Sequence, residues 1–251
     1  MVYFVGAGPG DVDLITVKGR ELIKTCDVII YAGSLVSPKH LDFCKEGCKI
    51  YDSASMTLEE VIEVMKENSQ GDSIIVRLHT GDPSIYGAIK EQMDELEKLN
   101  IEYTVVPGVS SFTAAASSIK REFTLPSVSQ TVILTRVEGR TPVPENESLE
   151  SLASHKASMA LFLSVGMIDK VVEKLKKGYG REDVSVAVIE RATWEDERII
   201  IGTLEDIAVK VKEAGIKKFA QILVGDFIDS EYEKSLLYDK TFTHEFRKGV
   251  K

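Results

Sequence analysis

Short runs of β-branched and aliphatic residues alternate with longer amphipathic stretches along most of the chain. Such alternation is typical of βαβ units, in which a helix connects successive strands of a mainly parallel sheet. The sequence therefore predicts an α/β protein. The expected strands are 2–5, 27–31, 49–51, 73–78 and 102–106, followed by 131–135, 157–163, 184–189, 198–201 and 220–224. The expected helices are 16–25, 58–68, 84–99, 114–119 and 167–177, and Gly178 is expected to end the last of these.

The length of 251 residues suits two domains of about 120 residues. A polar run from Lys120 ends in Pro126 and offers a boundary between them. We expect an N-terminal domain over 1–119, a linker over 120–127 and a C-terminal domain over 128–251. Each domain is expected to hold a mainly parallel or mixed sheet flanked by helices.

Acidic residues outnumber basic residues, 40 against 31, which gives a net charge of −9. This charge has the wrong sign for broad capture of nucleic acid or of an anionic membrane. No stretch approaches the roughly 18 uninterrupted apolar residues of a membrane span, and the N-terminus lacks the pattern of a leader. We therefore expect a cytoplasmic protein that binds neither nucleic acid nor membranes.

The three cysteines of the chain are Cys26, Cys44 and Cys48. Their number is odd, and the Cys44/Cys48 pair has no second pair of Cys or His at zinc spacing. We expect reduced thiols and no bound metal.

A glycine loop, Gly6-Ala7-Gly8-Pro9-Gly10-Asp11, follows the first expected strand. It fits the dinucleotide-binding pattern G-x-G-x-x-G only in its first two glycines. Pro9 removes an amide donor and Asp11 adds a negative charge, so a phosphate ligand is disfavoured. A plain tight turn is the alternative explanation for this loop.

Two further loops combine glycine with hydroxyl residues after an expected strand, and they span 78–87 and 106–116. In the first, Asp82 and Pro83 also form an ordinary helix start. In an open α/β sheet, however, ligands bind beyond the carboxyl ends of the strands, where glycine lets them approach the backbone. Three such loops at three strand ends predict one ligand cleft.

Four motifs in sequence order resemble the tetrapyrrole (corrin/porphyrin) methylase family, and they span nearly the whole chain. They are Gly6 to Asp11, Gly81-Asp82-Pro83, Pro107-Gly108-Val109-Ser110-Ser111 and Gly202-Thr203-Leu204. Within the family, Tyr31 to Val36 and Thr135 to Pro144 resemble the branch that methylates precorrin-4 or cobalt-precorrin-4 at C-11 in cobalamin biosynthesis. The resemblance implies a methyltransferase that uses S-adenosylmethionine, held in folded form between two domains, and a homodimer.

One departure concerns the residue after the tyrosine of the second strand. The uroporphyrinogen-III branch usually carries aspartate there, whereas this chain has Ala32 followed by Gly33. Another precorrin methylase or a uroporphyrinogen-III methylase stays the alternative within the family, followed by an RNA methylase, which the acidic charge disfavours. Outside it, the alternatives are a dinucleotide-dependent oxidoreductase and a binding module without activity.

The resemblance assigns cofactor contacts residue by residue. They are Pro9, Gly81, Asp82, Pro83, Ile85, Tyr86, Ser111, Phe112, Thr113, Phe162, Leu163, Ala187, Arg191, Thr203, Leu204, Ala220, Gln221 and Ile222. For the apolar members of the second half, ordinary strand packing is the alternative.

The tetrapyrrole substrate that the resemblance implies carries several carboxylates. We expect Arg136 and Arg140 to bind them, because arginine forks match carboxylates in bidentate fashion; Lys120, Arg121, Arg191 and Arg198 are second choices. Asp11 and His79 are also expected on the substrate side. Methyl transfer is a direct displacement, so no catalytic residue is assigned.

Overall fold

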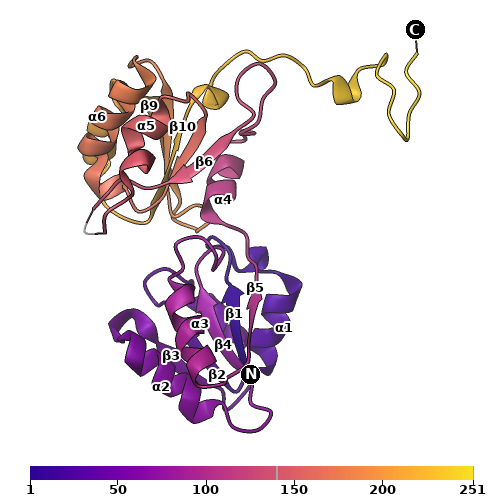
Figure 1. Cartoon of the computed structure of the whole chain (residues 1–251), viewed down its shortest axis with the longest axis vertical. Helices are drawn as coiled ribbons and strands as arrows, with labels where there is room; N and C mark the ends of the chain where they lie inside the picture. Colours follow the sequence, from indigo (N-terminus) through magenta and orange to yellow (C-terminus); the bar gives the residue numbers. More distant parts are fainter. Residues whose placement is uncertain (140, 251) are drawn as a thin grey trace. The chain divides into compact units, whose positions relative to one another are not determined.

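The computed structural model describes residues 1–139 and 141–250. The chain forms two compact units. Unit 1 comprises Met1–Ser118 and Arg191–Arg198, and unit 2 comprises Ile119–Glu190 and the chain from Ile199 on. Each unit is a five-stranded sheet with helices (Figure 1), which confirms the predicted α/β class. Within the described residues, no helix is both long enough and apolar enough to cross a membrane.

Unit 1 contains a parallel sheet with strand order β3-β2-β4-β1-β5. The strands are β1 (Val2–Gly6), β2 (Val28–Tyr31), β3 (Lys49–Asp52), β4 (Ile75–His79) and β5 (Tyr103–Val106). The helices are α1 (Val17–Thr25), α2 (Leu58–Asn68), α3 (Ile89–Lys98) and α4 (Ser111–Ser118). Apolar residues of α2 and α3 pack on one face of the sheet, and those of α1 pack on the other. The parallel order brings the carboxyl ends of all five strands to one edge.

Two helix starts in unit 1 test the local sequence signals. The Thr57 side chain accepts from the Glu60 amide while the Glu60 side chain accepts from the Thr57 amide, and this capping box begins α2. The helix predicted to begin at residue 84 instead begins at Ile89. Asp82 and Pro83 open a separate turn, in which the Ile85 amide donates to the Asp82 carbonyl, so the Asp-Pro signal marks this turn and not α3.

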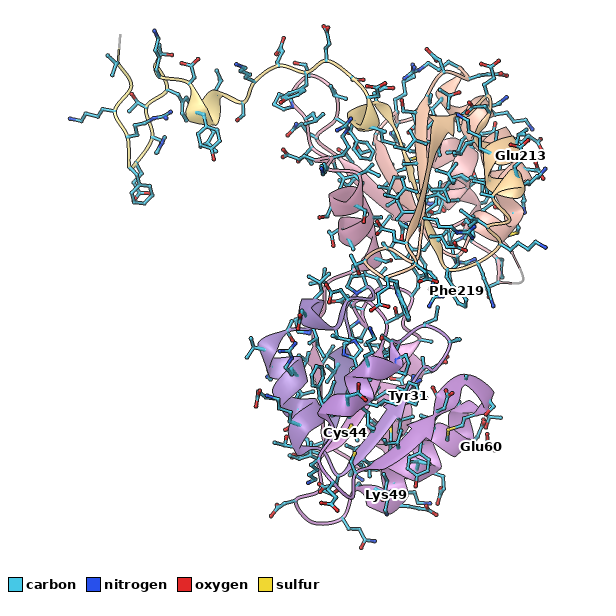
Figure 2. All side chains as sticks on the ribbon, turned by 180° about the vertical axis from the view of Figure 1, so that it is seen from behind. Tyr31, Cys44, Lys49, Glu60, Glu213 and Phe219 are labelled. Atoms are coloured by element: carbon cyan, nitrogen blue, oxygen red, sulfur yellow. The ribbon has the colours of Figure 1, made fainter. Side chains whose placement is uncertain are left out.

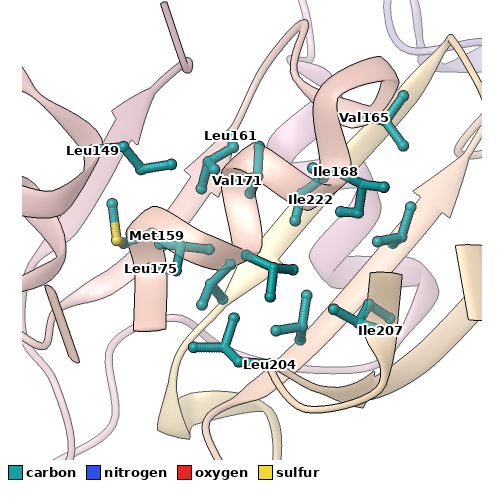
Figure 3. Packing of buried hydrophobic residues seen from close by; sticks show 14 of the residues in the cluster. Leu149, Met159, Leu161, Val165, Ile168, Val171, Leu175, Leu204, Ile207 and Ile222 are labelled. Carbon is teal, nitrogen blue, oxygen red and sulfur yellow. The ribbon is translucent and has the colours of Figure 1, made fainter. Parts of the chain in front are cut away.

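Unit 2 contains a mixed sheet with strand order β6-β7-β10-β8-β9. Its strands are β6 (Val132–Thr135), β7 (Ser158–Leu161), β8 (Ser185–Glu190), β9 (Arg198–Thr203) and β10 (Ala220–Val224). Strand β10 runs antiparallel to both neighbours, β7 and β8, whereas β6 and β7 are parallel. The helices are α5 (Leu149–Ala153), α6 (Ile168–Tyr179) and α7 (Ile207–Glu213), and their apolar faces pack against one side of the sheet (Figure 3).

Gly178 does not end α6, contrary to the sequence prediction. The helix continues to Tyr179 and ends at Gly180, which adopts a left-handed φ of 71°. A Cβ on Gly178 would lie 2.4 Å from the Glu150 carbonyl oxygen and 2.5 Å from the Ala153 Cβ. Gly178 is therefore needed for the close packing of α6 on α5, a helix that the sequence analysis missed along with α7.

Short 3-10 turns complete both units. They are Val12–Leu14, Pro38–Phe43, Ser53–Ser55, Glu145–Glu147, Val165–Met167, Asp226–Ile228 and Leu236–Tyr238. The predicted bounds of 1–119, 120–127 and 128–251 place residues 191–198 in the C-terminal domain. In the structure these residues belong to unit 1.

Candidate active site

The three glycine loops predicted to form a site lie together at one edge of the unit 1 sheet. Strand β1 lies between β4 and β5, so the loops that follow these strands are neighbours. Gly8 and Gly81 form an isolated antiparallel bridge, with the Gly81 amide donating to the Gly8 carbonyl at 2.8 Å. A Cβ on Gly108 would lie 2.2 Å from the Gly81 carbonyl oxygen and 2.8 Å from the Gly6 Cα. The close approach of the three backbones therefore excludes a Cβ at Gly6 and at Gly108.

Asp82 links two of these loops through its carboxylate. Oδ2 accepts from the Gly108 amide at 2.9 Å, and Oδ1 accepts from the Ser84 amide at 2.9 Å. Burial opposes ionisation, but the hydrogen bonds from Ser84 and Gly108 outweigh it and lower the pKa of Asp82. Asp82 is therefore a carboxylate at neutral pH, and its charge is directed to the backbone of the loops.

The Gly6–Asp11 loop has few amides left for a phosphate. Ala7 donates to the His79 carbonyl at 2.7 Å, and Gly8 donates to the Gly81 carbonyl at 3.3 Å. The Asp11 amide donates to Thr193 Oγ1 at 3.1 Å, and Asp11 Oδ1 caps the next turn by accepting from the Asp13 amide. Since Pro9 has no amide proton, the loop differs from a phosphate cradle in both charge and free donors.

Residues 191–198 pack against this loop although they come from the second half of the chain. The indole Nε1 of Trp194 donates to the Pro9 carbonyl at 2.9 Å, and a Cβ on Gly10 would lie 2.1 Å from the Trp194 ring. The Arg191 guanidinium lies over that ring, 4.3 Å from its centroid, and pairs with Asp196 at 2.8 Å. Pro9 and Arg191, both predicted cofactor contacts, are thus brought together by Trp194.

Sequence reasoning missed Thr193, Trp194 and Glu197. Glu197 accepts from the Thr193 amide and from the Ser118 hydroxyl, both at 2.7 Å, and so fixes the segment to the end of α4. A signal was present, because Trp194 is the only tryptophan of the chain. It follows Gly10 by more than 180 positions, and local patterns cannot indicate such a pairing.

The remaining unit 1 contacts follow the same two loops. Pro83, Ile85 and Tyr86 lie in the turn that Asp82 opens, and Ser111, Phe112 and Thr113 form the first turn of α4. Tyr86 is exposed and has a left-handed φ of 55°. A non-glycine residue in this region costs free energy, and such residues often occur where a loop is shaped for a ligand. Arg191 and Leu163, two other predicted contacts, also have a positive φ.

His79 ends β4 and is buried in unit 1, with its ring centroid 6.0 Å from that of Phe4. Among the described residues, its Nε2 atom has no hydrogen-bond partner. Burial and the nearby Arg77 guanidinium lower the pKa of His79 to about 3. His79 is therefore a neutral imidazole at pH 7, and its assignment to the substrate side stays a prediction.

In unit 2 the predicted contacts divide between the two opposite ends of the strands. Phe162 and Leu163 follow β7, and β7 ends beside the start of β10, where Leu161 pairs with Ile222. Leu163 is 69% exposed. The end of β8 also reaches this edge, since Glu190 pairs with Ala220. Phe219, labelled in Figure 2, directly precedes β10.

Thr203 and Leu204 do not lie at this edge. The Leu204 amide donates to the Val184 carbonyl, which places the end of β9 beside the start of β8. Leu204 and Ile222 pack in the unit 2 core, so only their backbones could contact a ligand, and Ala187 is buried in mid-strand. The Gln221 side chain donates to the Leu161 carbonyl at 2.9 Å.

The predicted carboxylate-binding loop follows β6. Arg136 donates to the carbonyls of Thr141 and Pro142 at 3.0 and 2.8 Å, so part of its guanidinium holds the loop itself. Glu138 anchors the same loop by pairing with Lys170 at 3.0 Å and Lys174 at 2.9 Å. Hydrogen bonds from Lys174 and, to a smaller extent, Lys170 lower the pKa of Glu138 to about 2, although burial acts in the opposite direction. Arg140 lies outside the described residues.

Comparison with known proteins identifies the family. The family model for Tetrapyrrole (Corrin/Porphyrin) Methylases matches residues 1–208, and the chain therefore belongs to this family of methyltransferases. A cobalt-precorrin-4 C(11)-methyltransferase of Methanocaldococcus jannaschii is 58% identical over 251 residues, which cover 100% of this chain and 97% of that protein.

Solved structures agree with this assignment. The X-ray structure of a cobalt precorrin-4 methyltransferase, a cobalamin biosynthetic enzyme, matches with a TM-score of 0.89 and 46% identity over 91% of this chain and 96% of that one. The uroporphyrin-III C-methyltransferase of Thermus thermophilus, solved with S-adenosyl homocysteine, shares the fold with a TM-score of 0.73 and 24% identity over 90% and 98% of the two chains. The predicted family and fold are thereby confirmed.

Proposed function

We propose that this protein transfers a methyl group from S-adenosylmethionine to C-11 of cobalt-precorrin-4 in cobalamin biosynthesis. The 58% identity to the Methanocaldococcus jannaschii enzyme over the whole chain carries this proposal. The uroporphyrinogen-III alternative has less support, because Ala32 and Gly33 stand where that branch usually has its aspartate. Here a Cβ on Gly33 would lie 2.2 Å from the Asp52 carboxylate, which accepts from the Gly33 amide.

The residues of unit 1 suit S-adenosylmethionine better than a nucleotide phosphate. The Gly6–Asp11 loop offers an acidic side chain and a proline, and three of its amides already have backbone or side-chain acceptors. A Cβ on Gly81 would have nothing closer than 3.6 Å, so the backbone is open to close approach there. Such an open carbonyl-rich loop suits a sulfonium cation and disfavours NAD.

Ligand placement is the main task that we assign to the protein. When bound, S-adenosylmethionine supplies an electrophilic methyl group for direct displacement by a nucleophilic ring carbon. Gly81 to Tyr86 and Ser111 to Thr113 would bind the cofactor, and alignment of donor and acceptor can lower the barrier by roughly 7 to 11 kcal/mol. Among the described residues the Nε2 atom of the neutral His79 has no partner, and we assign this residue no catalytic role.

The experiment that tests the function is an incubation of the protein with labelled S-adenosylmethionine and a set of tetrapyrroles. Cobalt-precorrin-4, metal-free precorrin-4 and uroporphyrinogen III would be supplied separately, and mass spectrometry with NMR would locate the new methyl group. We expect methylation at C-11 of cobalt-precorrin-4. Methylation of uroporphyrinogen III alone would contradict the proposal, and turnover of metal-free precorrin-4 alone would correct its substrate.

The resemblance also suggests a homodimer, and the sequence suggests a cytoplasmic location. Analytical ultracentrifugation of the purified protein would decide the first point. Fractionation of the source cells would decide the second.

A further inference from the structure

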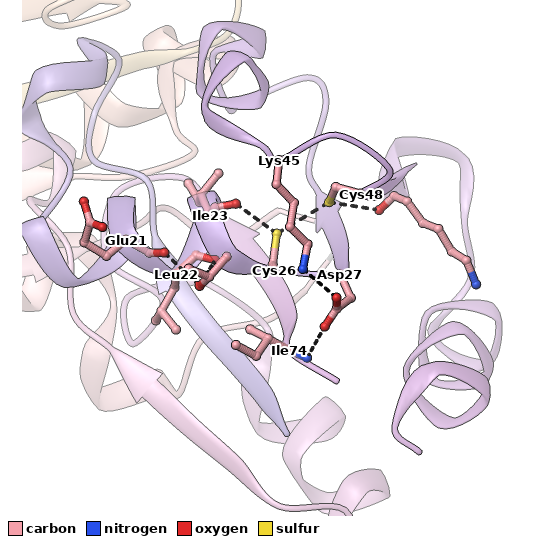
Figure 4. Close-up of polar contacts among 10 residues, drawn as sticks. Glu21, Leu22, Ile23, Cys26, Asp27, Lys45, Cys48 and Ile74 are labelled. Carbon is pink, nitrogen blue, oxygen red and sulfur yellow. Dashed lines mark hydrogen bonds and ion pairs between the residues drawn. The ribbon is translucent and has the colours of Figure 1, made fainter. Parts of the chain in front are cut away.

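All three cysteines of the chain meet at one place in unit 1, although 22 positions separate the first from the last. Their sulfur atoms all lie within 4.8 Å of one another, and the Sγ atoms of Cys26 and Cys48 are 3.5 Å apart (Figure 4). Cys26 is buried, whereas Cys44 and Cys48 are half-buried. The cluster is separate from the loops of the candidate active site and rests on none of the proposed function.

We propose that Cys26, Cys44 and Cys48 form a three-thiolate site for a thiophilic d10 cation, Zn(II) or Cu(I). Soft thiolate ligands select these ions. With a metal–sulfur distance of about 2.3 Å, sulfurs in tetrahedral or trigonal positions lie roughly 3.8 to 4.0 Å apart. The observed spacing, between 3.5 and 4.8 Å, brackets this value, so small side-chain rotations would bring all three sulfurs to one cation. Trigonal Cu(I) would need no further ligand, and tetrahedral Zn(II) would add a water molecule to the three sulfurs.

The backbone holds the three cysteines in place without help from the sulfurs. The Cys26 amide donates to the Leu22 carbonyl at the end of α1, and the Cys44 amide donates to the Leu41 carbonyl at 3.0 Å. The Cys48 amide closes a turn by donating to the Lys45 carbonyl at 3.2 Å, and Gly47 supplies the left-handed φ of 79° that this turn needs. A preorganised ligand set of this kind loses little entropy when it binds a cation.

A disulfide between Cys26 and Cys48 is the chief alternative. It would join only two of the three sulfurs that converge here, whereas a bound cation would use all three.

The site would link three segments of unit 1 through one cation. Cys26 ends α1, Cys44 ends the turn Pro38–Phe43, and Cys48 directly precedes β3, the outer strand of the sheet. Strand β3 is mostly exposed, and Lys45, in the loop before it, reaches Asp27 at 2.7 Å. The bound cation is therefore expected to stabilise this edge of unit 1 and to leave methyl transfer unchanged.

Anaerobic metal titration of the full chain tests the proposal. The reduced, chelator-treated protein would compete for Zn(II) with a chromophoric chelator and for Cu(I) with a Cu(I)-specific chelator, and Cd(II) would report thiolate-to-metal charge transfer. We expect one equivalent of Zn(II) or Cu(I), a higher melting temperature and a charge-transfer band with Cd(II). The competition constants and metal analysis of the protein as purified distinguish the two ions.

Variants separate this site from other metal ligands. Cys44→Ser and Cys48→Ser alter the two half-buried sulfurs and should each abolish stoichiometric binding, the Cd(II) band and the gain in melting temperature. His155→Gln removes an exposed imidazole and should change none of them. Binding that survives in Cys44→Ser, or a reduced protein that binds neither ion, overturns the proposal. A Cys26–Cys48 disulfide in a protein that binds no ion assigns the cluster to redox chemistry instead.

Discussion

In unit 1 the predicted ligand contacts follow parallel strands, whereas in unit 2 they come from strands that run in both directions. The loops after β1, β4 and β5 of unit 1 must meet at one edge, and Gly6, Gly81 and Gly108 pack there backbone to backbone. In unit 2, β10 runs against β7 and β8, so the start of one strand joins the ends of two others. Loops that follow successive strands can therefore be predicted to lie together in a parallel sheet, whereas in a mixed sheet the strand directions must also be known.

The two units also use their close glycine contacts differently. Gly108 lets the loops of the candidate site approach, while Gly178 lets α6 approach α5 in the interior of unit 2. Both positions would place a Cβ within 2.5 Å of a backbone carbonyl oxygen. This similarity makes them a matched pair for testing which unit shapes the cofactor site.

The largest effect is expected from Gly108→Ala. The new Cβ would meet the Gly81 carbonyl at 2.2 Å and force the loops apart, and a displacement of about 1 Å near a reaction can reduce the rate roughly a hundredfold. We expect such a loss in kcat/KM and weaker binding of S-adenosylhomocysteine, measured by steady-state kinetics and calorimetry.

Gly178→Ala is the control for this variant. It should destabilise the protein by about 1 to 3 kcal/mol through overpacking and leave the affinity for S-adenosylhomocysteine unchanged. If the two variants lose stability equally and neither loses affinity, the unit 1 loops do not form the cofactor site.

The next effect is expected from Asp82→Ala. Removal of the carboxylate leaves the Gly108 amide without its acceptor and frees the turn at Ser84, at a cost of about 1 to 3 kcal/mol. Cofactor affinity should fall at least tenfold. Asp169→Ala removes a carboxylate of unit 2 that pairs with Lys212 at 2.6 Å. Calorimetry should show unchanged affinity for Asp169→Ala; an equal loss in both variants would argue against a specific role for Asp82.

The third prediction concerns the loss of folding stability in acid, which should begin at a higher pH in unit 1 than in unit 2. His79 has an ordinary pKa of 6.5 and a folded pKa of about 3. Because the folded pKa is depressed, the folding stability is fully present above pH 6.5 and falls as the pH decreases toward 3. The slope is about 1.4 kcal/mol for each pH unit, so about 2 kcal/mol is lost at pH 5. In unit 2, the stability from Glu138 is lost only between pH 4.5 and about 2.

Trp194 reports on unit 1 alone, because it is the only tryptophan of the chain. Thermal unfolding followed by its fluorescence should shift to lower temperature between pH 6.5 and 5, and His79→Gln should reduce this shift. Arg77 faces His79 and keeps its charge throughout, since burial lowers its pKa only to about 10. A Trp194 transition that does not move over this pH range would show that His79 can protonate in the folded state.

Much of unit 1 could be predicted from the sequence because its signals are local. The capping box at Thr57 and the glycine loops after β1, β4 and β5 need only neighbouring residues to be recognised. The contact of Trp194 with Gly10 depends on the return of residues 191–198, and the packing of Gly178 on Glu150 depends on a helix pairing. Local propensity therefore assigned Gly178 to a helix end, whereas tertiary packing determines its role.

The arrangement of the candidate site depends on strand pairing as well. The family resemblance assigned both Thr203 and Leu204 and Phe162 and Leu163; the strand pairing places the two pairs at opposite ends of the unit 2 strands, and both assignments stay predictions. Register depends on pairing between distant strands, and a single sequence does not specify it. The convergence of Cys26 with Cys44 and Cys48 likewise arises from the meeting of α1 with the loop before β3.

The smallest effect is expected at the unit 2 loop that follows β6. Arg136→Ala should weaken binding of the tetrapyrrole substrate about tenfold, or about 1.4 kcal/mol, because part of the guanidinium already serves the carbonyls of Thr141 and Pro142. Cofactor affinity should stay unchanged, and part of the effect should fade as salt is raised.

Glu138→Gln is the matched control for Arg136→Ala, since it loosens the same loop at Lys170 and Lys174 and keeps the Arg136 guanidinium. Substrate and S-adenosylhomocysteine affinities would be measured by calorimetry for both variants at low and high salt. A salt-dependent loss confined to Arg136→Ala assigns the guanidinium to a substrate carboxylate, because a positioning effect would respond to either change. Equal losses in both variants would mean that Arg136 only holds the loop, and the carboxylate contacts must then be sought at Lys120, Arg121 or Arg191.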